Sequence, residues 1–154
     1  VLDGKNGSGK SSLLKVLLGE SIPHSGTITT SAGLVVSYVP QDTAHLNGLL
    51  SHFAEKHHLD ESLFKGILRK MGFERGRFEK KMEDFSAGQK KKVLLAASLC
   101  QPAHLYVWDE PLNFVDLHTR LQITSLLRQA QPTMLFVEHD RAFQEEIATQ
   151  KISL

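Results

Sequence analysis

The stretch Gly4-Lys-Asn-Gly-Ser-Gly-Lys-Ser11, GKNGSGKS, follows only three residues of a 154-residue chain. It fits the pattern G-x-x-x-x-G-K-[ST], whose glycines let successive backbone N–H groups point at phosphate oxygens. In this pattern Lys10 reaches the β- and γ-phosphates of a nucleotide, and Ser11 places its hydroxyl on Mg²⁺. The alternative is a Gly/Ser-rich turn that only caps the apolar helix expected over residues 12–18. The residues predicted to bind the nucleotide are Gly4, Lys5, Asn6, Gly7, Ser8, Gly9, Lys10, Ser11 and Ser12.

Composition and charge narrow the class of protein. A chain of 154 residues fits one domain with one core. Lys and Arg number 18 against 17 Asp and Glu, so the net charge of +1 gives no reason to expect direct DNA binding. The single cysteine, Cys100, excludes an internal disulfide and a cysteine-cluster metal site, and it is compatible with a reducing cytoplasm. No apolar run approaches the roughly 20 residues that a membrane-spanning helix needs.

The order of apolar segments indicates an α/β fold. Residues 105–108 and 133–137 have the length and composition of strands buried on both faces. A helical pattern over residues 117–130 separates them, which is the strand-helix-strand unit of a parallel sheet. Residues 27–30 and 34–39 are rich in β-branched side chains and predict two further strands joined by a short turn. Residues 42–85 are predicted to form a small helical insertion.

Two acids end the strand Leu105-Tyr-Val-Trp-Asp-Glu110, which resembles a Walker B motif. In that motif Asp109 holds Mg²⁺ through water, while Glu110 orients and deprotonates the attacking water. A solvated strand end explains the same two acids equally well when they are taken alone. The phosphate loop upstream favours the first interpretation.

Residues 85–89, Phe-Ser-Ala-Gly-Gln, resemble the signature sequence of the ATP-binding cassette (ABC) superfamily, which usually has Gly in place of Ala87. Ser86 is a natural helix N-cap, and Gly88 allows close approach to a phosphate. The resemblance implies that the signature closes over ATP held by a second cassette, either in the same full-length chain or in a homodimer. The residues concerned are Ser86, Ala87, Gly88 and Gln89.

The resemblance assigns the remaining positions and the fold. Gln41 corresponds to the Q-loop glutamine that senses Mg²⁺ and the attacking water, Asp116 to the D-loop, and His139 to the histidine that contacts the γ-phosphate. The D-loop position implies that Asp116 makes contacts across a nucleotide-sandwich dimer. It implies one ABC ATPase domain over residues 1–154, with residues 42–85 as a helical subdomain. The implied fold is a P-loop NTPase (RecA-like), with a mainly parallel sheet flanked by helices. The implied cofactors are ATP and Mg²⁺, the catalytic residues are Glu110, His139 and Gln41, and the metal site is Ser11, Gln41 and Asp109.

Two stretches resemble the ABC-F subfamily. Residues 138–143, Glu-His-Asp-Arg-Ala-Phe, resemble its H-D-R-x-F run, and residues 111–116 resemble its P-T-N-H-L-D run with three departures. With residues 88–93 they are similar to the second cassette of antibiotic-resistance ABC-F proteins of Gram-positive bacteria. This resemblance implies a cytoplasmic ATPase that acts on the ribosome. The alternative is the nucleotide-binding subunit of an ABC membrane transporter, with membrane subunits as partners.

Two further expectations concern charge and chain length. Lys90, Lys91 and Lys92 could form a basic face for ribosomal RNA, although a solvated helix surface balanced by glutamates is the better interpretation. A family cassette also carries a β-subdomain strand and an adenine-stacking aromatic residue before its phosphate loop. The resemblance therefore implies a chain whose N-terminal β-subdomain is largely missing, with reduced ATP affinity.

Overall fold

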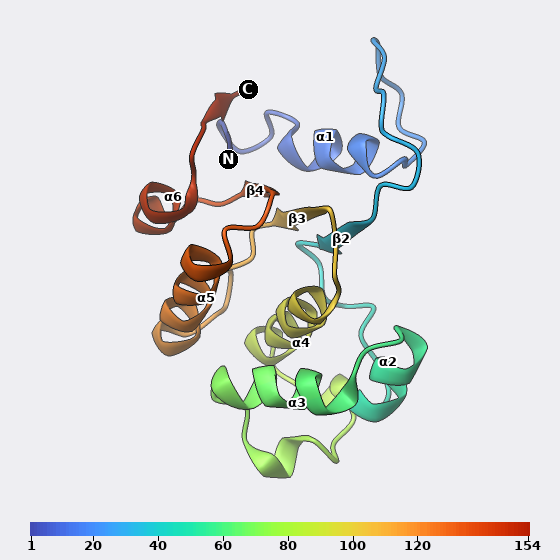
Figure 1. The fold of residues 1–154 in the computed structure, drawn as a ribbon, viewed down its shortest axis with the longest axis vertical. Helices are drawn as coiled ribbons and strands as arrows, with labels where there is room; N and C mark the ends of the chain where they lie inside the picture. Colours follow the sequence, from blue (N-terminus) through green and yellow to red (C-terminus); the bar gives the residue numbers. More distant parts are fainter.

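The computed structural model describes residues 1–154 as a parallel β-sheet flanked by helices (Figure 1). The five strands lie in the order β2-β3-β4-β1-β5, and every neighbouring pair is parallel. Their bounds are β1 Leu2–Asp3, β2 Val36–Val39, β3 Leu105–Asp109, β4 Met134–Val137 and β5 Ile152–Ser153. The α/β class with a parallel sheet, predicted from the apolar runs, is confirmed.

The chain forms six α-helices. They are α1 Lys10–Leu17, α2 Leu50–Lys56, α3 Glu61–Lys70, α4 Ala87–Cys100, α5 Leu117–Ala130 and α6 Arg141–Ile147. Short 3₁₀ turns span Arg75–Arg77 and Met82–Asp84. In Figure 1 α1 lies on one side of the sheet and α4, α5 and α6 on the other, while α2 and α3 pack beyond α4. None of the helices is both long and apolar enough to span a bilayer.

The central strands are apolar throughout because both of their faces are covered. Val107 and Val137 form a small core with Leu14 of α1 on one face. The adjacent residues point the other way: Trp108 follows Val107 in β3, and Phe136 precedes Val137 in β4. Both belong to the larger core on the opposite face of the sheet. Successive side chains of a strand point to opposite faces, so a strand buried on both sides has no polar alternation.

The strand predicted over residues 27–30 is absent. These residues lie in an exposed loop that leaves the body of the protein between α1 and β2 (Figure 1), and β2 begins only at Val36. Val36 is the first residue that pairs with β3, opposite Leu105. The β-branched composition of residues 27–30 was therefore misleading, because a strand also needs a neighbouring ladder and a packed face.

The C-terminal elements α6 and β5 were not predicted from the sequence. Phe143 of α6 is buried against Phe136, with ring centroids 5.4 Å apart. Strand β5 pairs with β1 through Leu2 opposite Ile152. Both elements are short, so neither produces a periodic pattern long enough to detect.

Truncation of a core residue of α4 tests the packing between the helices and the sheet. Leu95 is fully buried in the larger core. We expect Leu95→Ala to lower the free energy of unfolding by about 2–5 kcal/mol, because the cavity collapses only partly. Urea denaturation measures this value. The matched control is Leu63→Ala on α3, where the side chain is 51 % exposed and a change below about 1 kcal/mol is expected. Equal losses in both variants would contradict the packing described.

Candidate functional site

The phosphate loop joins β1 to α1 through backbone angles that glycine permits. Gly7 and Gly9 have φ of 81° and 94°, in the left-handed region. Gly9 is also the residue that precedes the first turn of α1. The free N–H groups of that turn therefore open toward the loop, which is the arrangement of an anion-binding site.

Lys10 lies inside the loop. Its side chain is largely buried, and Nζ donates hydrogen bonds to the carbonyl oxygens of Gly4 at 2.8 Å and Lys5 at 2.9 Å. These carbonyls hold the ammonium group at the centre of the loop. A phosphate entering the loop meets a preformed positive charge there.

A pocket of about 440 Å³ brings the loop together with three residues predicted as catalytic. Gln41 follows β2, Glu110 follows β3, and His139 follows β4. They reach one pocket because the carboxyl ends of parallel strands meet at the same edge of the sheet. The lining residues are Asn6, Gly7, Gly9, Lys10, Ser11, Ser12, Gln41, Glu110 and His139.

Asp109, the last residue of β3, is only 2 % exposed, and the Oδ1 atom of its carboxylate has no hydrogen-bond partner. Burial raises the pKa of Asp109 above its ordinary value, while the nearby hydroxyl of Ser11 acts in the opposite direction. An unpartnered buried carboxylate oxygen is costly unless a ligand satisfies it. A carboxylate beside a hydroxyl is the oxygen donor set that Mg²⁺ prefers, so the residues present fit this ion.

Three side chains converge on the carboxylate of Glu110. Gln41 Nε2 donates a hydrogen bond of 2.9 Å to Oε2, and the amide of Asn113 donates a second bond to the same atom. His139 Nε2 lies 3.5 Å from Oε1. Glu110 has a φ of 47°, so its backbone is in the left-handed region that a non-glycine residue rarely adopts. The fold maintains a strained conformation that directs this carboxylate toward the pocket.

Glu138 fixes the backbone on which His139 stands. Its carboxylate is buried, and Oε1 accepts hydrogen bonds from the N–H groups of His139 at 2.7 Å and Asp140 at 3.1 Å. The second oxygen accepts a bond of 3.0 Å from the N–H of Leu112. One side chain therefore connects the segment after β4 to the segment after Glu110.

Ser86 begins α4 with a complete capping box. Its hydroxyl accepts a hydrogen bond from the N–H of Gln89 at 3.2 Å, and the Gln89 side chain accepts one from the N–H of Ser86 at 3.0 Å. Neither these residues nor Ala87 and Gly88 line the pocket of the phosphate loop. The predicted signature residues thus lie together, but away from the pocket of the chain's own phosphate loop.

Asp116 caps α5 within its own chain. Its carboxylate accepts hydrogen bonds from the N–H and hydroxyl of Thr119 and pairs with Lys92 Nζ at 2.6 Å. Burial alone raises the pKa of Asp116, but the bonds from Lys92 and Thr119 outweigh it and hold the pKa well below the ordinary value. The contact across a dimer expected for this residue stays a prediction.

The three lysines of α4 do not form a basic surface. Lys91 is fully buried, and its Nζ donates to the carbonyl oxygens of Pro40 and Gln41. Lys92 Nζ bonds to the Met71 carbonyl in addition to Asp116. Both interpretations made from the sequence, an RNA-binding face and a solvated helix surface, are therefore wrong for these two residues. The reason is that α4 packs against both the sheet and α3, so a lysine there must find buried acceptors.

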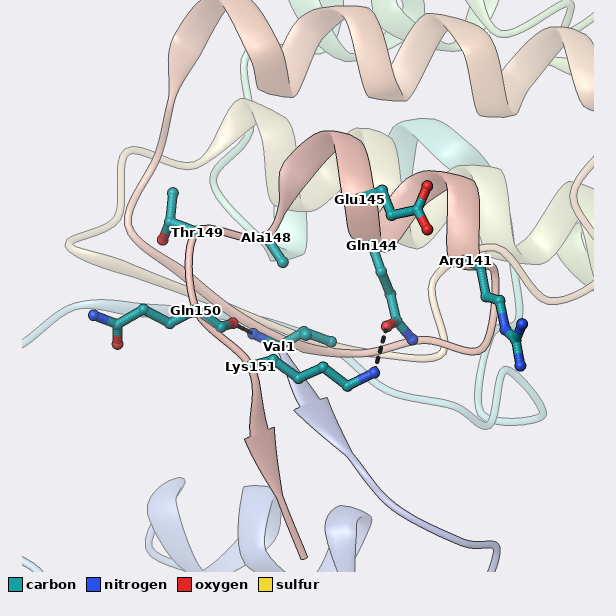
Figure 2. Close-up of a pocket in the computed structure, with 8 residues that line it drawn as sticks. All are labelled: Val1, Arg141, Gln144, Glu145, Ala148, Thr149, Gln150 and Lys151. Atoms are coloured by element: carbon teal, nitrogen blue, oxygen red, sulfur yellow. Dashed lines mark hydrogen bonds between the residues drawn. The ribbon is translucent and has the colours of Figure 1, made fainter.

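A second hollow, of about 490 Å³, lies between α6 and the two ends of the chain (Figure 2). The Val1 amino group donates to the Gln150 carbonyl there at 2.7 Å, and Lys151 reaches Gln144 at 3.4 Å. None of the residues predicted to bind nucleotide lines this hollow.

Comparison with known proteins identifies the family of this chain. The family model described as ABC transporter matches residues 1–113. The chain belongs to the ABC transporter family. It is therefore an ABC ATP-binding cassette, as its signature sequence indicated.

Individual relatives agree with this membership. The cassette is 31 % identical to the ATP-binding protein Uup of Caulobacter vibrioides, over 99 % of this chain and 27 % of that protein. It is 29 % identical to the ribosome protection protein VmlR of Bacillus subtilis, over 97 % of this chain and 28 % of that protein. A solved structure named RNase-L Inhibitor superimposes with a TM-score of 0.82 and 28 % identity, over 99 % of this chain and 31 % of that one. The cassette thus spans between a quarter and a third of each relative's length, and the resemblance to ABC-F proteins is confirmed.

Three neighbours of the site were not predicted from the sequence of the cassette. Asn113 lies three residues after Glu110. Its place in the run over residues 111–116 was the only feature of the sequence that pointed to it. Glu138 was seen only as the residue before His139, and Lys91 only as one of three lysines. Each acts on backbone or side-chain atoms that are close in space, and a linear pattern does not reveal such contacts.

Substitution of Gly88 tests the contact between the signature and the D-loop of this cassette. A Cβ on Gly88 would overlap the carbonyl oxygen of Phe114, so the backbone on one side must move. We expect Gly88→Ala to lower the free energy of unfolding by about 1–3 kcal/mol, as overpacking does. The matched control is Gly66→Ala in the middle of α3, where a Cβ meets nothing within 4 Å and should stabilise by about 0.5–1 kcal/mol. Thermal unfolding of both variants measures the difference, and a stabilised Gly88→Ala would contradict the contact.

The depressed pKa of Asp116 predicts a dependence of stability on pH. The folded pKa lies below the unfolded value of about 3.9, so the stabilisation is complete above that pH and disappears as pH falls toward the folded pKa. We expect Asp116→Asn to be less stable than wild type at pH 7, with a difference that shrinks below about pH 4. Urea denaturation between pH 3 and pH 7 measures it. Lys92→Met should reduce the same pH-dependent part, whereas a difference that does not change with pH would exclude the charge as its cause.

Proposed function

We propose that this cassette binds Mg-ATP and hydrolyses it with the help of a second cassette, as part of an ABC-F protein that acts on the ribosome. The observation that carries the enzymatic part is the convergence of Gln41, Asn113 and His139 on Glu110, beside the phosphate loop. Resemblance to VmlR, which is named a ribosome protection protein, supports the ribosomal part.

Binding would begin at the phosphate loop. In the proposed complex Lys10 Nζ leaves the carbonyls of Gly4 and Lys5 for the β- and γ-phosphates, while the N–H groups of the first turn of α1 receive the remaining phosphate oxygens. Ser11, Gln41 and Asp109 would hold Mg²⁺, which neutralises charge on the phosphates. The unpartnered Oδ1 of Asp109 supports this assignment.

Hydrolysis would proceed through Glu110. We assign to its carboxylate the proton of the water that attacks the γ-phosphate, with ADP and phosphate as products. Gln41 and Asn113 direct the carboxylate through one oxygen, and His139 lies near the other. His139 would contact the γ-phosphate, and Glu138 holds its backbone in place.

A second cassette would complete the site. Ser86, Ala87, Gly88 and Gln89 lie outside the chain's own pocket, and α4 begins there with free N–H groups. We propose that this helix start faces ATP held by the other cassette, and that Asp116 lies at the same junction. In this arrangement residues 1–154 form one ABC ATPase domain, and residues 42–85 are its helical subdomain. The proposed site of action is the cytoplasm.

The test uses the complete protein with Glu110→Gln, Mg-ATP and ribosomes. A general base contributes about 10²–10⁴-fold, so ATP hydrolysis should fall by that range while binding persists. We expect the variant to accumulate in the ribosome pellet after ultracentrifugation. The matched control is Glu145→Gln on α6, an exposed glutamate outside the pocket, which should behave as wild type.

Two outcomes would contradict the proposal in different ways. Hydrolysis by Glu110→Gln at the wild-type rate would exclude Glu110 as the base. An inactive variant that leaves ribosomes as readily as wild type and fractionates with membranes would favour the nucleotide-binding subunit of a transporter.

A double variant that carries both Lys10→Met and Glu110→Gln tests the role of the phosphate loop. It should no longer pellet with ribosomes, because the phosphates lose their principal cation.

A further inference from the structure

Lys91 is a buried charge that the proposed reaction does not use. It lies on α4, five residues after Ser86, and its side chain is fully buried. Its Nζ donates hydrogen bonds to the carbonyl oxygens of Pro40 at 2.9 Å and Gln41 at 3.1 Å. No carboxylate lies within ion-pair distance of it. Burying an ammonium group costs solvation free energy that an apolar side chain would not lose, so packing alone does not explain a lysine here.

The two acceptors of Lys91 belong to the segment that presents Gln41. Pro40 and Gln41 directly follow β2, which ends at Val39. The side chain of Gln41 then donates to Glu110 Oε2 at 2.9 Å. A continuous series of hydrogen bonds thus leads from α4 through the backbone after β2 to the carboxylate of Glu110.

The charge of Lys91 also suits its surroundings. Burial lowers the pKa of Lys91, and the carboxylates of Asp109, Glu110 and Glu138 oppose this shift most strongly. Asp109 and Glu138 are themselves buried. The ammonium group therefore lies beneath the acidic side of the pocket and offsets part of its negative charge.

The neighbouring residue provides a contrast. Lys90 has the same charge on the same helix, but its side chain is half-buried and makes no hydrogen bond or ion pair. The two lysines differ in their contacts, so a comparison between them separates the effect of the bonds from the effect of charge.

We propose that Lys91 is a positioning residue that ties α4 to the segment carrying Gln41, so that the Gln41 amide stays on Glu110. Hydrogen bonds from a charged donor are stronger than neutral ones, and two of them hold this backbone to the helix. A shift of α4, whose first residues are the signature, is therefore transmitted to Gln41. The role of the tie in catalysis rests on the proposed function, since Glu110 is the base only there.

The first test needs no nucleotide. Hydrogen–deuterium exchange of the protein alone, in wild type, Lys91→Met and Lys90→Met, reports on the backbone amides of residues 41–44. We expect exchange in this segment to become about tenfold faster in Lys91→Met and to stay unchanged in Lys90→Met, since only Lys91 bonds to the segment. Unchanged exchange in Lys91→Met would overturn the proposal. Faster exchange spread equally over β3 and α5 would also overturn it, because it would show a general loss of stability.

The second test measures steady-state ATP hydrolysis by the complete protein. We expect Lys91→Met to lower kcat about tenfold and to change KM for ATP less than about twofold, because the phosphate loop is untouched. Lys91→Arg, which keeps the charge and the donors, should recover part of kcat, and Lys90→Met should match wild type. A raised KM with unchanged kcat would overturn the positioning role. If Lys91→Met does not fold, Lys91→Gln, a neutral donor, replaces it with the same expected pattern in both tests.

The two proposals fail separately. An active Glu110→Gln variant would remove the assigned base, but it would leave the exchange result for residues 41–44 unaffected. An inactive Glu110→Gln variant together with unchanged exchange in Lys91→Met would leave the function standing and remove the role of Lys91.

Discussion

The parallel ladder between β3 and β4 is the constraint on which the candidate site depends. Trp108 lies opposite Phe136 and Asp109 opposite Val137, and the N–H of Glu110 continues the ladder to the Val137 carbonyl at 2.9 Å. This register ends both strands at the same level, so the acids after β3 and the histidine after β4 share one edge. A slip by one residue would exchange the two faces of a strand and would turn Asp109 away from the phosphate loop.

The charges that the fold buries are concentrated at this edge. Four ionisable side chains are buried in the whole chain: the cations of Lys10 and Lys91 and the carboxylates of Asp109 and Glu138. All four surround the segments that carry Gln41, Glu110 and His139. Buried charge is expensive and rarely retained for stability alone, which is why such groups mark functional regions. The two cations and two anions also balance in formal charge, so these four buried groups together carry no large net charge.

The sequence predicted the local parts of this arrangement and missed the parts made by distant residues. The phosphate loop, the acids that end β3 and the N-cap at Ser86 are runs of neighbouring residues whose chemistry can be read directly, and all of them lie in the expected elements. The strand expected over residues 27–30 failed because nothing in the linear pattern shows whether a neighbouring strand exists. Lys91 was placed on the surface because its acceptors are 50 residues away or more along the chain. Burial of a lysine is decided by such partners and not by its own helix.

The seven residues from Glu110 to Asp116 connect the phosphate pocket to the start of α4. Glu110 and Phe114 both have positive φ, which costs free energy that neighbouring contacts must offset. The buried carboxylate of Glu138 holds the N–H of Leu112, and Asp116 is held by Lys92 of α4. Glu110 lines the pocket of the phosphate loop. The carbonyl oxygen of Phe114 lies against Gly88 and occupies the space that a side chain at this position would need. The segment that carries Glu110 is therefore in direct contact with the start of α4. The phosphate pocket and the first turn of α4 are thus connected by this strained turn on one side and by the two hydrogen bonds of Lys91 on the other.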